Sequence, residues 1–148
     1  MTPIPPAALI LGLAGLIPFV WGAVTALYPG IGGASGLQPV FLGTYLSLTY
    51  GTVILSFMSG VLWGFATRAT GREAAVGYAL SVIPVLWAFI MVNGGAANAA
   101  INLAAGFVGL LALDYSFWRQ GLAPDWWLRL RLILTAGVLA CLMVPILG

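Results

Sequence analysis

The chain has 148 residues, of which 62% are hydrophobic and 5% are charged, and its formal net charge is +2. Soluble domains carry about 25% charged residues, so this composition excludes an ordinary water-exposed globular domain. The five basic residues are all arginines, too few to form the basic patch that binds nucleic-acid phosphates. We therefore interpret the chain as an integral membrane protein and expect no nucleic-acid partner.

Five apolar stretches define the expected fold. Each is close to the about 20 residues that a helix needs to cross about 30 Å of hydrocarbon, and none alternates polar and apolar residues as a membrane β-strand does. The first stretch has no Lys or Arg before it, so we expect a retained span rather than a signal peptide. The sequence predicts an all-α fold, a single transmembrane domain of five helices. The expected spans are residues 7–27, 42–66, 74–92, 99–117 and 130–147.

The positions of the arginines predict the orientation of the bundle. All five follow the second or the fourth stretch, so they lie on the same side of a five-span chain. The connections 28–41 and 93–98 carry no charge. Because cytoplasmic loops carry the excess of basic residues, we expect the N-terminus inside and the C-terminus outside. The arginines concerned are Arg68, Arg72, Arg119, Arg129 and Arg131.

Asp114 is the one acidic residue within a predicted span. A carboxylate at the bilayer centre costs about 2.5–3.5 kcal/mol on insertion scales and suggests a functional site. Asp114 lies three residues before the predicted end of its helix, so we expect a shallow position that water or an arginine can reach. We predict a structural ion pair, with Arg119, Arg129 and Arg131 as the candidate partners. A role in transport is the alternative.

Small residues recur every four positions along the second stretch. The spacing places the first three on one helix face and the last three on one helix face, where the absence of large side chains lets helix backbones approach closely. We predict that this face packs against other helices, and the alternative is a flexible or pore-lining helix. The residues are Gly43, Ser47, Gly51, Ser56, Gly60 and Gly64.

Three tryptophans surround the connection between the fourth and fifth stretches. Trp118, Trp126 and Trp127 are predicted to anchor the protein at the headgroup level, where amphipathic rings are stable. Arg129 and Arg131 can extend their charged ends to lipid phosphates while their stems cover apolar surface. The alternative function of this segment is docking to a lipid or a partner protein.

Two further polar or helix-breaking features lie within the spans. Asn98 and Asn102 are four residues apart on one helix face, and either form interhelical hydrogen bonds or line a wet vestibule. Pro18, Pro84 and Pro145 lie inside apolar stretches, where proline can kink a helix.

Catalytic signals are absent from the sequence. We find no nucleophile elbow, no phosphate-binding loop, no metal-ligand spacing and no paired carboxylates. The chain has no histidine, which is the commonest metal ligand and general base, and its single cysteine, Cys141, lies in an apolar stretch. We therefore expect neither an enzyme nor a bound metal or cofactor.

Three segments together carry a family resemblance. Residues 11–19 read LGLAGLIPF, residues 50–64 contain a Tyr-Gly and a Trp-Gly pair, and the LALD of residues 111–114 is followed by GLAP at 121–124. The chain resembles the family called domain of unknown function 3429 over nearly its whole length. The resemblance implies a five-helix protein of bacterial inner or mitochondrial inner membranes with no established reaction. Relatives typically carry a histidine where this chain has Leu62, which further argues against catalysis and cofactor binding here.

These observations favour an accessory or assembly subunit of a larger complex in a bacterial inner membrane, for example a complex of an energy-transducing membrane. Its partners would be the lipid bilayer and other membrane subunits, contacted by helix packing. The alternative is a transporter of small solutes or lipids with a pathway between the second and fourth spans.

Overall fold

The computed structural model describes residues 2–148, and this part of the chain is helical with no strand. Within it, five helical segments are long and apolar enough to cross a membrane, which confirms the predicted fold class. Their ends lie within three residues of the predicted boundaries. The segments are Pro6–Leu27, Gly43–Ala66, Gly71–Met91, Ala96–Arg119 and Trp127–Leu147.

The first and third spans are each interrupted, and the other three are continuous. The helices in chain order are α1 (Pro6–Ala14), α2 (Ile17–Leu27), α3 (Pro29–Ala34), the short 3₁₀ helix η1 (Pro39–Phe41), α4 (Gly43–Ala66), α5 (Gly71–Ser81), α6 (Ile83–Met91), α7 (Ala96–Arg119) and α8 (Trp127–Leu147). The helices α3 and η1 belong to the connection between the first two spans, so they add no further crossing.

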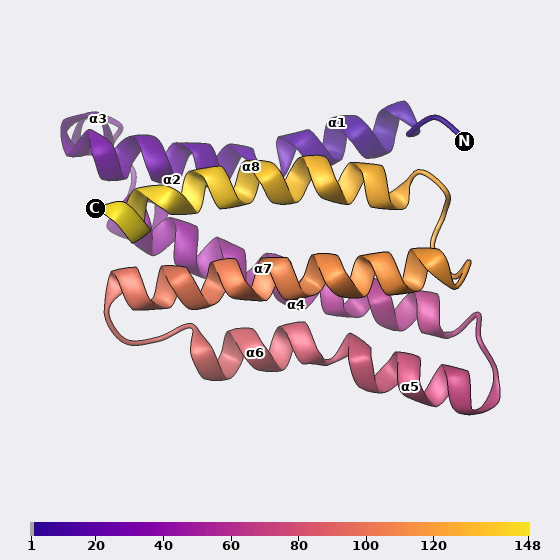
Figure 1. The fold of residues 1–148 in the computed structure, drawn as a ribbon. Helices are drawn as coiled ribbons and strands as arrows, with labels where there is room; N and C mark the ends of the chain where they lie inside the picture. Colours follow the sequence, from indigo (N-terminus) through magenta and orange to yellow (C-terminus); the bar gives the residue numbers. More distant parts are fainter. Residues whose placement is uncertain (1) are drawn as a thin grey trace.

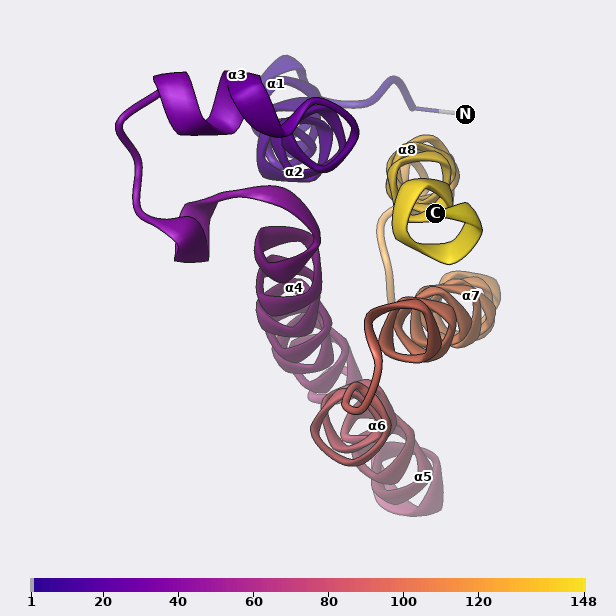
Figure 2. The same cartoon turned by 90° about the vertical axis from the view of Figure 1, so that its left-hand side faces the viewer.

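The spans run side by side with the two chain ends at opposite ends of the bundle (Figure 1). Viewed from the end, α2 and α8 lie on one side, α5 and α6 on the other, and α4 and α7 between them (Figure 2). Helix α7 packs against α8 and α4, and α2 packs against α4 and α8. Buried apolar side chains from α2, α4 and α7, including Phe19, Leu55 and Phe107, form the core at their junction.

The interruption of the first span follows from Pro18, which is the second residue of α2. Proline has no backbone N–H, so the helical hydrogen bond to the residue four positions earlier is lost. At this break the Tyr50 hydroxyl of α4 donates to the Gly15 carbonyl oxygen at 3.0 Å. The break therefore lets α1 leave the line of α2.

The third span breaks in the same way at Pro84, the second residue of α6. The nearby Val85 N–H donates to the Ser59 hydroxyl of α4 at 2.9 Å, so a buried donor has an interhelical partner. Pro145, by contrast, lies within α8 without ending it. Two of the three prolines thus coincide with an interruption.

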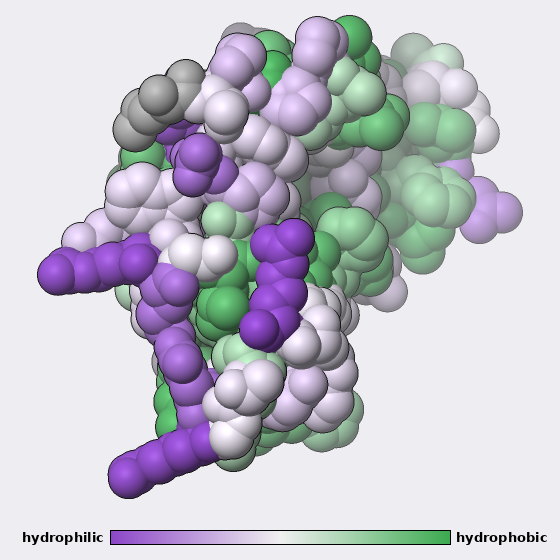
Figure 3. All heavy atoms as spheres, turned by 90° about the vertical axis from the view of Figure 1, so that its right-hand side faces the viewer, coloured by the Kyte–Doolittle hydropathy of each residue, from purple (hydrophilic) through white to green (hydrophobic). Residues whose placement is uncertain are grey.

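One end of the bundle carries the charges. Four helix ends lie there: the end of α4, the start of α5, the end of α7 and the start of α8 (Figure 1). All five arginines lie in or next to these helix ends. Strongly hydrophilic side chains are gathered on this end (Figure 3). The side of the membrane that it faces stays a prediction.

Candidate functional site

Asp114 lies at the centre of a buried polar cluster formed by α7 and α8. Its side chain is fully buried, and the Arg131 Nε–H donates to Oδ2 at 2.9 Å in a salt bridge whose guanidinium side is 5% exposed. The Trp127 indole N–H donates to the other carboxylate oxygen, Oδ1, also at 2.9 Å. Trp127 and Arg131 are four residues apart on α8, so one helix face presents both donors to the same carboxylate.

Packing holds the donors in place. The ring of Phe65, on α4, meets the Trp127 ring edge to face with their centres 5.1 Å apart. The Arg131 residue is 4% exposed and Thr135, one turn further along α8, is 2% exposed. The site is therefore a neutral ion pair shielded by aromatic and aliphatic groups.

The Asp114 carboxylate is more deeply enclosed than expected. The sequence suggested a shallow residue near water, but Asp114 is fully buried within the bundle. Arg131 does reach the carboxylate, as expected, but water does not, because α7 continues to Arg119, five residues or about 7.5 Å beyond Asp114 at 1.5 Å per residue. Trp127, in the first turn of α8, also contacts the carboxylate.

Two of the three candidate arginines do not pair with Asp114. Arg119 instead donates to the Tyr115 hydroxyl at 3.2 Å, on the exposed side of α7. Arg129 donates to the backbone carbonyl oxygen of Thr2. Arg129 and Arg131 differ by two positions, and a rotation of about 200° along a helix sends them to opposite faces. Only Arg131 therefore meets α7.

The three tryptophans have different environments. Trp118 donates from its indole nitrogen to the Asp125 carbonyl oxygen at 3.0 Å. The Trp126 ring lies against that of Trp127, with their centres 6.0 Å apart. Trp127 binds the buried carboxylate, a role that sequence reasoning missed. Its position four residues before Arg131 is the signal that could have found it.

The small residues of α4 form two separate surfaces. A Cβ atom added to Gly51 would lie 2.5 Å from Leu103 of α7, and one added to Gly22 of α2 would lie 2.4 Å from the Ser47 hydroxyl. Gly43 has a backbone φ of +59° and its N–H donates to Thr25 of α2 at 2.7 Å. This first trio therefore lies at contacts within the bundle.

The second trio, Ser56, Gly60 and Gly64, lies elsewhere. No atom comes within 4 Å of a Cβ added to Gly60 or Gly64, and both glycines are exposed. Within the described chain these two glycines contact no neighbouring helix, because the buried row continues from Gly51 to Leu55. Residue 56 starts a row offset by one position, which is about 100° around the helix.

The junction between α4 and α7, where a transport pathway was considered, is filled by side chains. A Cβ added to Gly106 would lie 2.9 Å from Leu55 and 2.8 Å from Trp87. Asn102 joins α6 to α7, since its carbonyl oxygen accepts from the Trp87 indole N–H at 2.7 Å and its side-chain amide donates to Met91 at 3.0 Å. Asn98 is exposed at the start of α7.

The described residues contain no group of three or more His, Cys, Asp or Glu side chains that could hold a metal ion. Leu62, where the resembling family was expected to carry histidine, is fully buried in the core. The contacts of the buried cluster are the ion pair and the hydrogen bond from Trp127.

Five apolar helices around this cluster define a multi-pass α-helical integral membrane protein. A family model described as "Protein of unknown function (DUF3429)" matches residues 4–147, and the chain belongs to this family. The resemblance drawn from the sequence is thereby confirmed.

Two curated relatives are similar to the chain, and both are called "Transmembrane protein 69". The one from Xenopus tropicalis is 31% identical over 140 residues, which cover 88% of this chain and 50% of the relative. The one from Mus musculus is 27% identical over 135 residues, which cover 88% of this chain and 51% of the relative. The chain thus spans about half the length of the curated relatives it matches. No solved structure gives a significant match.

Proposed function

We propose that this protein is an accessory or assembly subunit of a larger membrane complex, and that it binds a neighbouring subunit through the outer face of α4. The observation that carries the proposal is the row Ser56, Gly60 and Gly64, which faces away from the protein's own core. Rows of small residues let two membrane helices approach closely, and close approach supplies most of the packing energy between them.

The row is chemically suited to a helix partner. Ser56 donates to the Thr52 carbonyl oxygen of its own helix at 2.9 Å, so its hydroxyl does not require a polar ligand. Phe57 and Trp63, which lie beside the row, are 65% and 49% exposed. They would flank a helix lying along the glycines and extend the buried apolar area.

The proposed membrane and orientation rest on general rules. An α-helical bundle suits a bacterial inner membrane, since outer-membrane proteins are typically β-barrels. The arginine-rich end of the bundle would face the cytoplasm, because basic residues are concentrated in cytoplasmic loops. The N-terminus would then be inside and the C-terminus outside.

The transport alternative draws no support from the α4–α7 junction. Leu103 and Leu55 close against Gly51 and Gly106 there, and the carboxylate proposed to act in transport is already paired with Arg131. An accessory role needs no passage through the bundle, and it uses the surface that the fold leaves exposed.

The test is affinity purification from the native membrane in a mild detergent, followed by quantitative mass spectrometry. We expect a recurrent stoichiometric partner with the wild-type protein, and at least tenfold less of it with Gly60→Leu/Gly64→Leu. Gly109→Leu is the matched control, because Gly109 is also an open glycine in a span but lies on α7. The proposal fails if no stoichiometric partner is found, or if the double variant recovers as much of it as the control does.

A further inference from the structure

An apolar cavity of about 310 Å³ lies at the charged half of the bundle, between α1, α4 and α8. It exists because α1 leaves the line of α2 at Gly15 and packs mainly on α8, whereas α2 packs on both α4 and α8. Leu11 and Phe57, which line it from α1 and α4, are 71% and 65% exposed. The cavity therefore opens sideways, toward the position of lipid.

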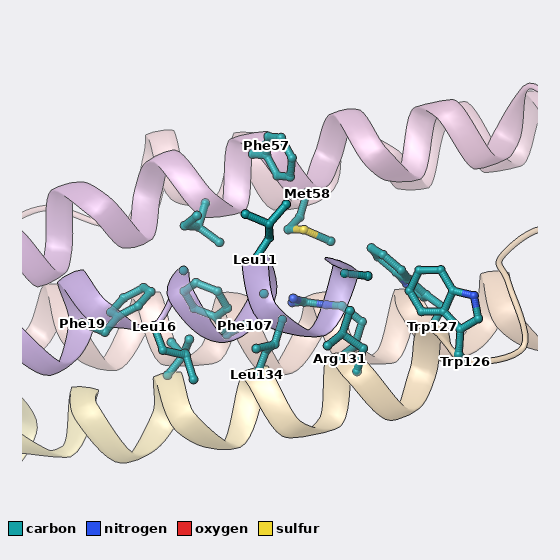
Figure 4. Close-up of a pocket in the computed structure, with 16 residues that line it drawn as sticks. Leu11, Leu16, Phe19, Phe57, Met58, Phe107, Trp126, Trp127, Arg131 and Leu134 are labelled. Atoms are coloured by element: carbon teal, nitrogen blue, oxygen red, sulfur yellow. The ribbon is translucent and has the colours of Figure 1, made fainter. Parts of the chain in front are cut away.

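Arg131 is the charged residue that lines this cavity. Figure 4 shows its side chain directed from α8 into the space among the apolar lining residues. Its Nε–H is used by Asp114, but the terminal nitrogen Nη2 is buried and has no hydrogen-bond partner among the described residues. An unpaired buried donor on a charged group is costly, so a ligand that brings an acceptor oxygen to it would be stabilised.

The length of the cavity matches that of a lipid acyl chain from one leaflet of the bilayer. Its lining on α8 extends from Trp126 and Trp127 to Val138, which is about 16 Å at 1.5 Å per residue. This is close to half of the about 30 Å of hydrocarbon in a bilayer. Trp126 and Trp127 mark the end near the headgroups, where tryptophan is enriched, and Phe19 and Phe107 lie near the other end of the lining (Figure 4).

We propose that the cavity binds one acyl chain of a diester glycerophospholipid from the leaflet on the arginine-rich side. The ester carbonyl oxygen of that chain accepts a hydrogen bond from the terminal guanidinium nitrogens of Arg131, and the phosphate stays outside at the level of Trp126. The acyl chain lies along the apolar side chains between α1 and α4.

The charge of the site favours an ester over a free fatty acid. Asp114 already neutralises Arg131 at 2.9 Å, so a carboxylate entering the cavity would bring an uncompensated charge into apolar surroundings. An ester carbonyl supplies an acceptor oxygen without a net charge. The inference does not depend on the proposed subunit role, since Ser56, Gly60 and Gly64 do not line the cavity, although Phe57 borders both surfaces.

The first experiment uses the full chain purified in detergent and native mass spectrometry with dioleoyl phosphatidylcholine as the probe. We expect one retained phospholipid per chain. Leu134→Trp fills the cavity and leaves both residues of the ion pair unchanged, and it should reduce the retained fraction at least tenfold. Leu132→Trp is the matched control on the same helix, because Leu132 is 49% exposed and does not line the cavity.

The second experiment leaves the protein unchanged and alters the ligand. The diether analogue of the same phospholipid lacks the ester carbonyls, and we expect it to bind at least about tenfold more weakly, as the loss of one hydrogen bond to a charged group predicts. Oleate should bind more weakly than the diester. The proposal is overturned if Leu134→Trp retains phospholipid as Leu132→Trp does, if the diether or oleate binds as tightly as the diester, or if a second copy of the chain is retained instead of lipid.

Discussion

The substitution Asp114→Asn removes the negative charge beside Arg131 and keeps nearly the same shape. Asparagine still offers one oxygen to the donors of Trp127 and Arg131, so the change tests the charge rather than the packing. The guanidinium is 5% exposed. It would be left as an uncompensated buried charge.

The size of the effect follows from the burial of both partners. Breaking a buried ion pair by removing one member costs about 3–5 kcal/mol, because the other charge stays desolvated. A pair at 2.9 Å with exposures of 5% and 0% belongs to this class. Arg131→Met should cost less, since the Asp114 carboxylate can be neutralised by a proton whereas a guanidinium cannot. The double change Asp114→Leu/Arg131→Met should cost least, because no charge is left.

The single cysteine provides the assay. Cys141 lies on α8 and is partly buried in the folded bundle, so a fluorescent maleimide should label it faster as the protein unfolds in a graded series of denaturing detergent. The midpoint of labelling then ranks the variants on one scale. Arg119→Met is the matched control: Arg119 is exposed, and exposed ionic contacts are worth about 1 kcal/mol or less.

We expect the order of stability loss to be Asp114→Asn, then Arg131→Met, then the double variant, with Arg119→Met close to wild type. The reasoning is refuted if Asp114→Asn unfolds at the same midpoint as Arg119→Met. It is also refuted if the double variant loses as much stability as both single variants combined, because the buried charge would then not be the cause.

Two further predictions concern neighbouring contacts and use the same labelling assay. Trp127→Phe keeps an aromatic ring, although a smaller one, and removes the donor to Asp114. We expect a loss of at least about 1.5–3 kcal/mol, the value of a hydrogen bond to a charged group; an unchanged midpoint would show that the 2.9 Å contact contributes nothing. Gly22→Ala places a methyl group 2.4 Å from the Ser47 hydroxyl and should cost about 1–3 kcal/mol by overpacking, whereas Gly109→Ala, in open space, should be neutral or stabilising. Equal midpoints for these two glycine variants would contradict the close approach of α2 and α4.

The sequence was sufficient for the architecture because hydropathy and length alone identify a membrane span. Twenty or so apolar residues without a charge have few other stable environments, so the five spans were predicted within three residues of their observed ends. The prolines were visible too, but the sequence did not show that Pro18 and Pro84 interrupt their spans while Pro145 does not. That outcome depends on partners such as Tyr50 and Ser59 on α4.

The candidate site was recognised in part. A single carboxylate within a span is costly unless it is paired, so a partner was expected. The nearby arginines were the candidate partners. The choice of Arg131 over Arg129 depends on which face of α8 meets α7, and charge counting carries no information about that rotation. The same applies to α4, where Gly51 lies inside and Gly60 outside although both belong to rows with a spacing of four.

By itself, then, the sequence determined that this chain is a five-span helical membrane protein with its charges at one end, because these properties depend on composition summed over whole segments. Only the tertiary structure decided which arginine neutralises Asp114, which glycines face a neighbour, and that a lateral cavity opens where α1 leaves the line of α2. Those outcomes depend on the rotation and bending of helices against each other. A rotation of about 100° per residue turns a shift of one position into a different neighbour.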